Sequence, residues 1–174
     1  MPSRVEEAAS KAVGFAKAAK AAVESLSGVF RLLTKEHGEV SALLIRVKTS
    51  SDLQVRRDLF PTISRELLAH EVGEVSAVYP AFRGHPELEA MVSEHEEEAG
   101  ELEQMLNDLS VLPFDADDWA PRFAQLVDLV KRHTSREEDE YFPKASRILG
   151  KAEAERIQAA YENSKANALQ QMTQ

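Results

Sequence analysis

The chain has 174 residues, of which 43% are hydrophobic and 29% are charged, so it suits one globular domain rather than a disordered or membrane-embedded chain. It contains no cysteine, which excludes disulfide frameworks, thiolate metal sites, iron–sulfur clusters and cysteine nucleophiles. The formal net charge of -9 repels phosphate backbones, so we expect no nucleic-acid partner.

The first predicted element is a helical N-terminal extension over residues 1–27. It lacks the compact apolar run of a secretory signal and carries Glu6 and Glu7, and no later stretch reaches the roughly 18 apolar residues of a membrane span. We therefore expect a cytoplasmic protein without a transmembrane segment. Residues 8–23 carry three Lys and no acid. We interpret this segment as packing on the bundle or on a second subunit, with a homodimer, a partner helix or an anionic membrane surface left open.

Apolar residues recur at spacings of three and four along the rest of the chain, which is the period of helices that bury one face. The pattern predicts a helix from a break at Gly28 to about residue 44, and further helices over 59–77, 88–109, 119–141 and 151–170. No strand-like alternation competes with it. We therefore predict an all-α fold: an up-down four-helix bundle with an N-terminal helical extension and a C-terminal helix. The expected divisions are 1–27, 28–149 and 150–174.

Local signals mark where these helices start. Ser27 is a candidate cap of the first bundle helix, and Pro61 is expected to kink the second. The other start signals are Ser51-Asp52, Gly84-His85-Pro86 and Asp117-Asp118.

Four of the five His occupy apolar helix positions, one on each bundle helix: His37, His70, His95 and His133. The fifth, His85, lies in a turn. A single His on an apolar face is more often a core residue bonded to a backbone carbonyl. Four unpaired imidazoles in one small core would cost several kcal/mol, and coordination to a shared ion removes that cost.

Two carboxylates accompany these imidazoles in a repeated motif. His70–Glu74 and His133–Glu137 both read HxxxE, a spacing that puts both side chains on one helix face. Tyr79-Pro80 follows the first motif and Phe142-Pro143 the second, 63 residues apart. Because an unpaired buried carboxylate is very costly, the pattern favours a cation between the His and Glu side chains.

Six donors are too many for one tetrahedral zinc and suit two octahedral ions bridged by both carboxylates. Iron is the natural choice for mixed nitrogen and oxygen ligands with open positions, and manganese and zinc use the same ligand types. The pattern resembles the hemerythrin-like, HHE cation-binding family over residues 30–149, including the endings AVYP (77–80) and EYFP (140–143). The resemblance implies two non-haem iron ions with an oxo, hydroxo or water bridge. The ligands that it implies are His37, His70, Glu74, His95, His133 and Glu137.

One position departs from the oxygen-carrying hemerythrins, which have a second His one turn after the third-helix ligand. Ala99 stands there, so the ion served by His95 is expected to have fewer protein ligands unless Glu94 or Glu98 supplies an oxygen. The function expected from the resemblance is binding or sensing of dioxygen or redox state. The alternative is an enzyme that decomposes hydrogen peroxide, as a catalase does, or reduces nitric oxide. A metal-free structural bundle is a third reading.

Two further features lie close to these motifs in the sequence: an acidic run and two tyrosines. The acidic run over residues 96–103 is interpreted mainly as a solvent-exposed helix face. Tyr79 and Tyr141 are expected to pack in the core, and a hydrogen bond from either hydroxyl to a metal-bound oxygen species is the alternative.

Overall fold

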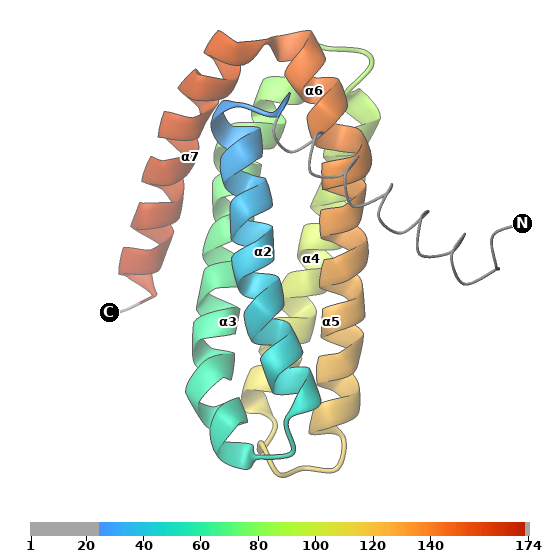
Figure 1. The fold of residues 1–174 in the computed structure, drawn as a ribbon, viewed down its shortest axis with the longest axis vertical. Helices are drawn as coiled ribbons and strands as arrows, with labels where there is room; N and C mark the ends of the chain where they lie inside the picture. The colour runs from blue at the N-terminus through green and yellow to red at the C-terminus, as the bar shows by residue number, and fades with distance from the viewer. Residues whose placement is uncertain (1–24, 173–174) are drawn as a thin grey trace, which may run out of the picture.

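Four long antiparallel helices form the body of the molecule in a computed structural model that describes residues 25–172 (Figure 1). The bundle helices are α2 (Gly28–Thr49), α3 (Leu53–Gly73), α4 (Glu89–Val111) and α5 (Trp119–Arg136). The described residues contain no strand, so the predicted all-α bundle is confirmed. The expected N-terminal extension falls almost wholly on residues 1–24, which lie outside the described part. No described helix has both the length and the apolar character that a bilayer crossing requires.

A further helix, α7 (Lys151–Gln171), runs outside the bundle along α2 and α3 (Figure 1). Its predicted span of 151–170 is confirmed to within one residue. Gly28, at the start of α2, has a φ of +54°. A Cβ there would lie 2.4 Å from the carbonyl carbon of Ala154 in α7. Glycine is therefore required both by the backbone conformation and by the close approach of α7.

The predicted start signals have mixed outcomes. Asp52 caps α3 as expected, because its carboxylate accepts a hydrogen bond from the Gln54 N–H at 2.8 Å. Ser27 has the extended backbone of a cap, but its side chain makes no capping hydrogen bond. The expected start of α4 at Pro86 is wrong: the Leu88 N–H bonds to the His85 carbonyl in a turn, and the helix begins at Glu89.

The two helices that carry the HxxxE motifs both pass into a single wide π turn. α3 continues as η1 (Glu74–Val78), and α5 continues as η3 (Glu137–Tyr141). The Tyr79 N–H bonds to the Glu74 carbonyl and the Phe142 N–H to the Glu137 carbonyl, each five residues back.

Proline explains why the turn widens at the same place in both helices. Pro80 and Pro143 lack an N–H, and a proline ring clashes with the carbonyl four residues before it in an α-helix. One extra residue in the turn relieves that clash, so each π turn begins at the Glu of its motif. The chain then continues as a short 3₁₀ turn, η2 (Tyr79–Phe82), in the first case and as α6 (Phe142–Leu149) in the second.

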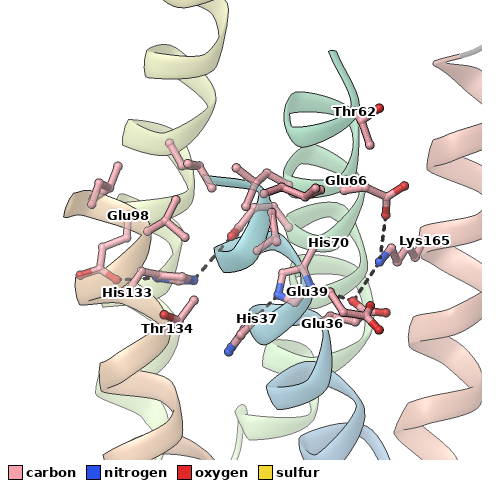
Figure 2. A pocket seen from close by; sticks show the side chains of 17 residues that line it. Glu36, His37, Glu39, Thr62, Glu66, His70, Glu98, His133, Thr134 and Lys165 are labelled. Carbon is pink, nitrogen blue, oxygen red and sulfur yellow. Dashed lines mark hydrogen bonds and ion pairs between the residues drawn. The ribbon is translucent and has the colours of Figure 1, made fainter. Parts of the chain in front are cut away.

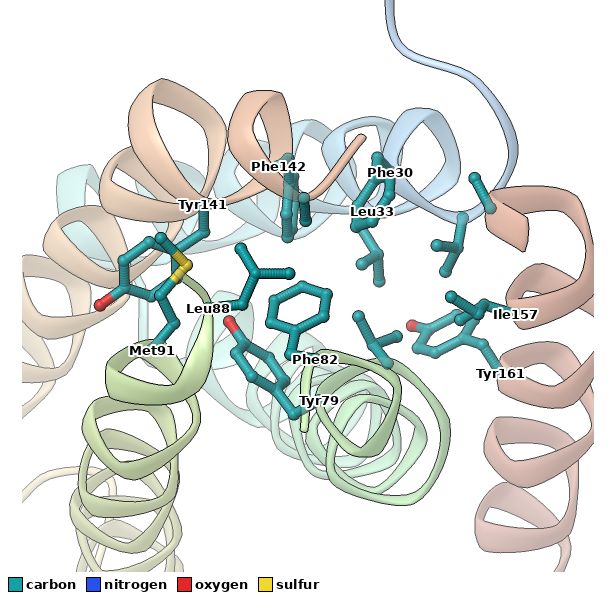
Figure 3. Close-up of a cluster of buried hydrophobic side chains, with 14 of the residues drawn as sticks. Phe30, Leu33, Tyr79, Phe82, Leu88, Met91, Tyr141, Phe142, Ile157 and Tyr161 are labelled. Atoms are coloured by element: carbon teal, nitrogen blue, oxygen red, sulfur yellow. The ribbon is translucent and has the colours of Figure 1, made fainter. Parts of the chain in front are cut away.

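Two clusters of buried apolar side chains divide the bundle along its axis. The upper cluster, at the α6 end of Figure 1, is centred on Phe30, Phe82 and Phe142, and Ile157 and Tyr161 of α7 complete it (Figure 3). The lower cluster lies toward the opposite end and contains Trp119, whose ring stacks on Phe123 at a centroid distance of 5.0 Å. The polar side chains of the predicted motifs lie between the two clusters.

Candidate metal centre

The structure brings all six predicted ligands together in the bundle interior. Their exposed fractions are at most 6%. α2, α3, α4 and α5 each supply one His, and the two Glu come from the first residues of the π turns. His85 lies in the loop before α4, apart from this group, as expected.

One half of the centre is built by His37 and His70. Their Nε2 atoms lie 3.3 Å apart. His37 Nε2 is 3.3 Å from Glu137 Oε2, and His70 Nε2 is 3.3 Å from Glu74 Oε1. One donor atom from each of His37, His70 and Glu74 lies within 4.8 Å of the other two, a spacing that suits a single ion.

The other half is built by His95 and His133, together with a residue that the sequence reasoning missed. Glu71 places one carboxylate oxygen 3.5 Å from His95 Nε2 and the other 3.5 Å from His133 Nε2. Glu74 Oε2 lies 3.7 Å from His95 Nε2, and Glu137 Oε2 lies 3.4 Å from His133 Nε2. Glu74 and Glu137 therefore contact imidazoles of both halves, as residues shared between two ions must do.

Glu71, rather than Glu94 or Glu98, is the additional carboxylate that contacts His95 and His133 through their Nε2 atoms. Glu98 lies behind His133, where it accepts hydrogen bonds from His133 Nδ1 at 2.8 Å and from Arg136 at 2.6 Å. Glu94 accepts a hydrogen bond from the Tyr141 hydroxyl. The available signal was the spacing of three between Glu71 and Glu74, which puts both carboxylates on one side of α3.

Buried polar atoms without hydrogen-bond partners gather at this centre. Among the described residues, nine buried side-chain atoms lack a partner, and seven of them belong to this centre. These are Glu71 Oε2, Glu74 Oε1 and Oε2, His95 Nδ1 and Nε2, His133 Nε2, and Glu137 Oε2. Leaving so many polar atoms unpaired in a dry core is very costly, and cations between them would satisfy them. The residues present therefore fit a pair of metal ions.

Three of the four imidazoles are held from behind by a carboxylate. His37 Nδ1 lies 2.8 Å from Glu138, and His70 Nδ1 lies 2.9 Å from Glu36. Together with the bond between His133 and Glu98, these contacts fix ring orientation, direct Nε2 to the centre and raise its basicity, as is usual for metal-binding His.

His95 is positioned differently, by an aromatic ring. The Tyr79 ring stacks on the His95 ring with a centroid distance of 3.7 Å and an interplanar angle of 8°. The Tyr79 hydroxyl also donates a hydrogen bond of 2.6 Å to Glu137 Oε1. Tyr79 therefore packs in the core and orients two of the predicted ligands at once.

The C-terminal helix α7 contributes to the surroundings of His70, which the sequence reasoning did not foresee. The Tyr161 hydroxyl lies 2.9 Å from His70 Nδ1 and also donates a hydrogen bond to Glu36. Lys165 Nζ lies 2.9 Å from the same Glu36 oxygen. Burial opposes ionisation of Glu36, but these three donors outweigh it and lower its pKa to about 2. Gly73 makes room for this arrangement, because a Cβ there would lie 2.5 Å from the Tyr161 ring.

The three central carboxyls compete for protons. Burial, and after it the negative charge of Glu74, raise the pKa of Glu71 and of Glu137 to about 7. Burial also opposes ionisation of Glu74, but the neighbouring His70 imidazolium outweighs it and holds the Glu74 pKa well below its usual range. Near neutral pH, bound protons therefore neutralise part of the negative charge of these carboxyls, and metal ions would displace those protons.

The two imidazoles of the second half differ in pKa. Burial lowers the pKa of His95 to about 4, so its ring is neutral at neutral pH. Burial acts in the same direction on His133, but the Glu137 carboxylate and the hydrogen bond to Glu98 raise its pKa to about 10. Metal binding at this half must therefore release a proton from His133 at neutral pH.

A cavity of about 290 Å³ lies on the side of the centre that faces the lower cluster, which is the upper part of Figure 2, where Thr62 is labelled. Its inner end is formed by His37, His70, Glu71 and His133. Its walls are apolar and come from α2, α3, α4 and α5: Val40, Leu43, Leu67, Leu102, Leu129 and Val130. The opposite side of the centre is closed by the upper cluster. A small molecule therefore reaches the centre from the lower side.

Comparisons with known proteins agree with this geometry. The sequence model of the hemerythrin HHE cation binding domain matches residues 28–145. A curated protein of Nostoc sp. (strain PCC 7120), named DNA nickase, is 24% identical over 141 residues. That alignment covers 81% of this chain and 40% of the Nostoc protein, so the chain spans about two fifths of this relative. No solved structure matches the chain significantly.

Proposed function

The chain belongs to the hemerythrin HHE cation-binding family, and from that premise we propose that it holds two non-haem iron ions between its two hydrophobic clusters and uses them to bind or sense dioxygen or redox state. The observation that carries this proposal is the set of seven unpaired, buried nitrogen and oxygen atoms that face one another in the bundle interior. Mixed imidazole and carboxylate donors suit iron.

The distances divide the donors between two ions. His37 and His70 would hold the first ion, and His95, His133 and Glu71 would hold the second. Glu74 and Glu137 would bridge the two, because each contacts imidazoles from both halves. The protein thus offers four donor residues to the first ion and five to the second.

Bound iron supplies a metal that changes oxidation state and keeps coordination positions open for a small ligand. The residues around it orient and insulate the centre. Glu36, Glu98 and Glu138 hold three imidazoles in place, and the upper cluster excludes water from one side. The cavity on the other side is lined with Leu and Val near the centre, which suits entry of an apolar molecule such as dioxygen.

Binding or sensing is favoured over peroxide decomposition or nitric oxide reduction by the state of the polar groups along the cavity. Glu36 and Glu98 are each held in hydrogen bonds with an imidazole and a cationic side chain, and Glu66 is paired with Lys165. Among the described lining residues, every acid or base beyond the proposed ligands is in an ion pair, including Glu39, whose Oε1 lies 3.4 Å from Lys35 Nζ. The enzymatic functions remain the second candidate.

The test is elemental analysis followed by an oxygen titration. Protein purified with iron is expected to contain about two iron ions per chain, the number that the two donor groups predict. Adding dioxygen to the reduced protein should change its absorption spectrum, and removing dioxygen should reverse the change. Failure to retain any metal after reconstitution would contradict the proposal. Rapid turnover of hydrogen peroxide, well above that of free iron, would favour the enzymatic alternative.

We do not extend DNA cleavage, the activity named for the Nostoc relative, to this chain. The net charge of -9 opposes binding to a phosphate backbone. A supercoiled plasmid incubated with iron-loaded protein tests this directly. Conversion to the nicked form that a Glu137→Ala variant fails to produce would restore nicking as a candidate function.

A further inference from the structure

The cavity below the proposed iron centre is much larger than a diatomic ligand requires. Its volume is about 290 Å³. A water molecule occupies roughly 30 Å³ of the liquid, and an apolar cavity of roughly 150 Å³ is enough to bind benzene. The space therefore fits an organic molecule of roughly twice that size.

The cavity is also elongated along the bundle. Its lining includes Leu102, seven residues after His95, and Thr62, eight residues before His70. At about 1.5 Å of rise per helical residue, it extends roughly 10 Å from the imidazoles. A compact ligand bound at the centre would leave most of this length unfilled.

The walls divide by chemistry into three zones. The inner end carries the proposed ligands and, next to them, Glu36, Glu98 and Thr134. Leu and Val side chains, which offer no hydrogen bonds, line the apolar part, and Glu39, Thr62, Glu66 and Lys165 form a polar rim. Lys165 Nζ is 2.9 Å from Glu36 and 3.4 Å from Glu66, so its charge is already paired (Figure 2).

These zones define the orientation of an occupant. An oxygen-bearing head group is repelled by the carboxylates of the rim and attracted by a cation at the inner end. An aliphatic tail matches the Leu and Val walls, because burial of each methylene group away from water favours binding. The first ion has the fewer protein donors and adjoins the cavity through His37 and His70, so it can accept the head group.

We infer, on the basis of the proposed iron centre, that this cavity binds a short aliphatic molecule with one oxygen-donor head group directed at the centre. Carboxylic acids and alkyl hydroperoxides share this chemistry. The ligand range of the centre thus extends from diatomic molecules to medium-chain organic ones.

The first experiment is calorimetric titration of iron-loaded protein with octanoate and with acetate. Octanoate is expected to bind at least about a hundredfold more tightly, because its tail fills the apolar walls. It should also perturb the absorption spectrum of the iron centre. Equal affinities for octanoate and acetate would overturn the inference. A series with eight-carbon tails and carboxylate, hydroperoxide or alcohol heads then identifies the preferred head group by its affinity.

Variants that fill the cavity provide the control. Leu43→Phe and Leu102→Phe each place a larger side chain in the wall and should weaken octanoate binding by about tenfold or more. Leu32→Phe is the matched control, because Leu32 is half-buried on the same helix as Leu43 and packs against the upper cluster instead. If both cavity variants fold and still bind octanoate as the unaltered chain does, the inference is wrong.

Iron content is measured first on every sample, so that the two proposals fail separately. Two irons per chain without octanoate binding would overturn only the cavity proposal. If the protein retains no iron after reconstitution but still binds octanoate, and Leu43→Phe abolishes that binding, the iron centre and the head-group assignment are wrong. The cavity is then still an apolar binding site.

Discussion

The two segments that carry the HxxxE motifs, here called the first repeat (residues 70–82) and the second repeat (residues 133–145), are alike at the shared ligands and different around them. Each begins with an inward His, enters a π turn at its Glu and continues through an aromatic residue and a proline. The proline favours the π turn locally, so Glu74 and Glu137, the proposed bridging carboxylates, are placed in the same way in both repeats.

The differences lie at positions that the repeat leaves free. Glu71 follows the His of the first repeat and reaches the other half of the centre, whereas Thr134 occupies the matching position and lines the cavity. Gly73 precedes the Glu of the first repeat and admits Tyr161, whereas Arg136 holds Glu98 against His133. Repeated residues thus place the two proposed bridging carboxylates symmetrically, and the others make the two proposed ion positions unequal.

Removing a bridging carboxylate is expected to have the largest effect, and the same effect in both repeats. Glu74→Ala and Glu137→Ala should each reduce iron to below about half an ion per chain, because each Glu serves both halves and its loss leaves buried imidazoles without their partner. Elemental analysis measures this. His85→Ala should keep both ions. Retention of iron by only one of the two Ala variants would break the equivalence of the repeats.

Glu71→Gln should expose the inequality instead. We expect loss of about one iron ion per chain, because Glu71 contacts imidazoles of the second half only. Thr134→Val at the matching position should keep both ions. If Glu71→Gln binds two ions as tightly as the unaltered chain does, Glu71 is not a ligand of the second ion.

A change of pH should act on both repeats together. Glu71 and Glu137 have pKa values of about 7, so protons compete with metal at both positions as the pH falls below 7. Iron affinity, measured by competition with a chelator, should therefore fall by about tenfold for each proton taken up per pH unit. An affinity independent of pH between 5 and 8 would contradict this.

The metal-free protein should respond in the opposite direction. The folded pKa of Glu71 and Glu137 lies above the usual 4.5, and that of His133 lies above the usual 6.5, so the folded state binds more protons than the unfolded state. The free energy of unfolding should therefore fall as the pH rises, through Glu71 and Glu137 between about 4.5 and 7 and through His133 between about 6.5 and 10. His95, with its lowered pKa, contributes the reverse only between about 4 and 6.5. Urea unfolding across this range is the measurement.

Removing the supports behind the imidazoles should have a smaller effect on each half. Tyr161→Phe removes a hydroxyl from Glu36 and His70, and Arg136→Gln removes a cation from Glu98. Each should weaken iron binding by about 10- to 100-fold, with the first ion affected by Tyr161→Phe and the second by Arg136→Gln. Chelator competition with each variant tests this assignment. An unchanged affinity in Tyr161→Phe would show that the Tyr161 hydroxyl does not support His70.

Glycine substitutions should give the smallest effects, and effects of opposite sign. Gly73→Ala places a Cβ against the Tyr161 ring and should destabilise the metal-free protein by about 1–3 kcal/mol. Gly100→Ala, on a helix surface with nothing within 4 Å of the added Cβ, should stabilise it by about 0.5–1 kcal/mol. Urea unfolding compares the two. Equal effects would mean that Tyr161 moves aside at little cost.

Much of the bundle followed from the sequence because helical periodicity is a local property. The spacing of four in HxxxE put His70 and Glu74 on one face of α3, and the structure places both inside the bundle. The cap at Asp52 likewise depended on neighbouring residues alone. The π turns were missed although Pro80 and Pro143 signalled them, because a helical stripe drawn through both motifs conceals one extra residue in the turn.

The remaining errors concern contacts between helices. Glu71 does not belong to the HxxxE motif formed by His70 and Glu74. Its contacts with His95 of α4 and His133 of α5 depend on how the helices pack against one another. Tyr161 lies on a polar helix with weak amphipathic character, so nothing in its spacing placed it against His70. Glu98, considered as a further oxygen donor, lies instead behind His133 and pairs with Arg136, a contact between α4 and α5 that the spacing within α4 does not reveal.

The position of α7 determines how long a segment must be transferred to another protein to keep the proposed centre intact. The family match ends at residue 145, and every proposed ligand precedes that point. Tyr161 and Lys165, which hold the carboxylate behind His70, lie beyond it. Grafting only the matched segment into another protein would carry over a complete set of donors with one imidazole less firmly supported. The portable unit for an engineer who wants the intact centre therefore extends at least to Lys165.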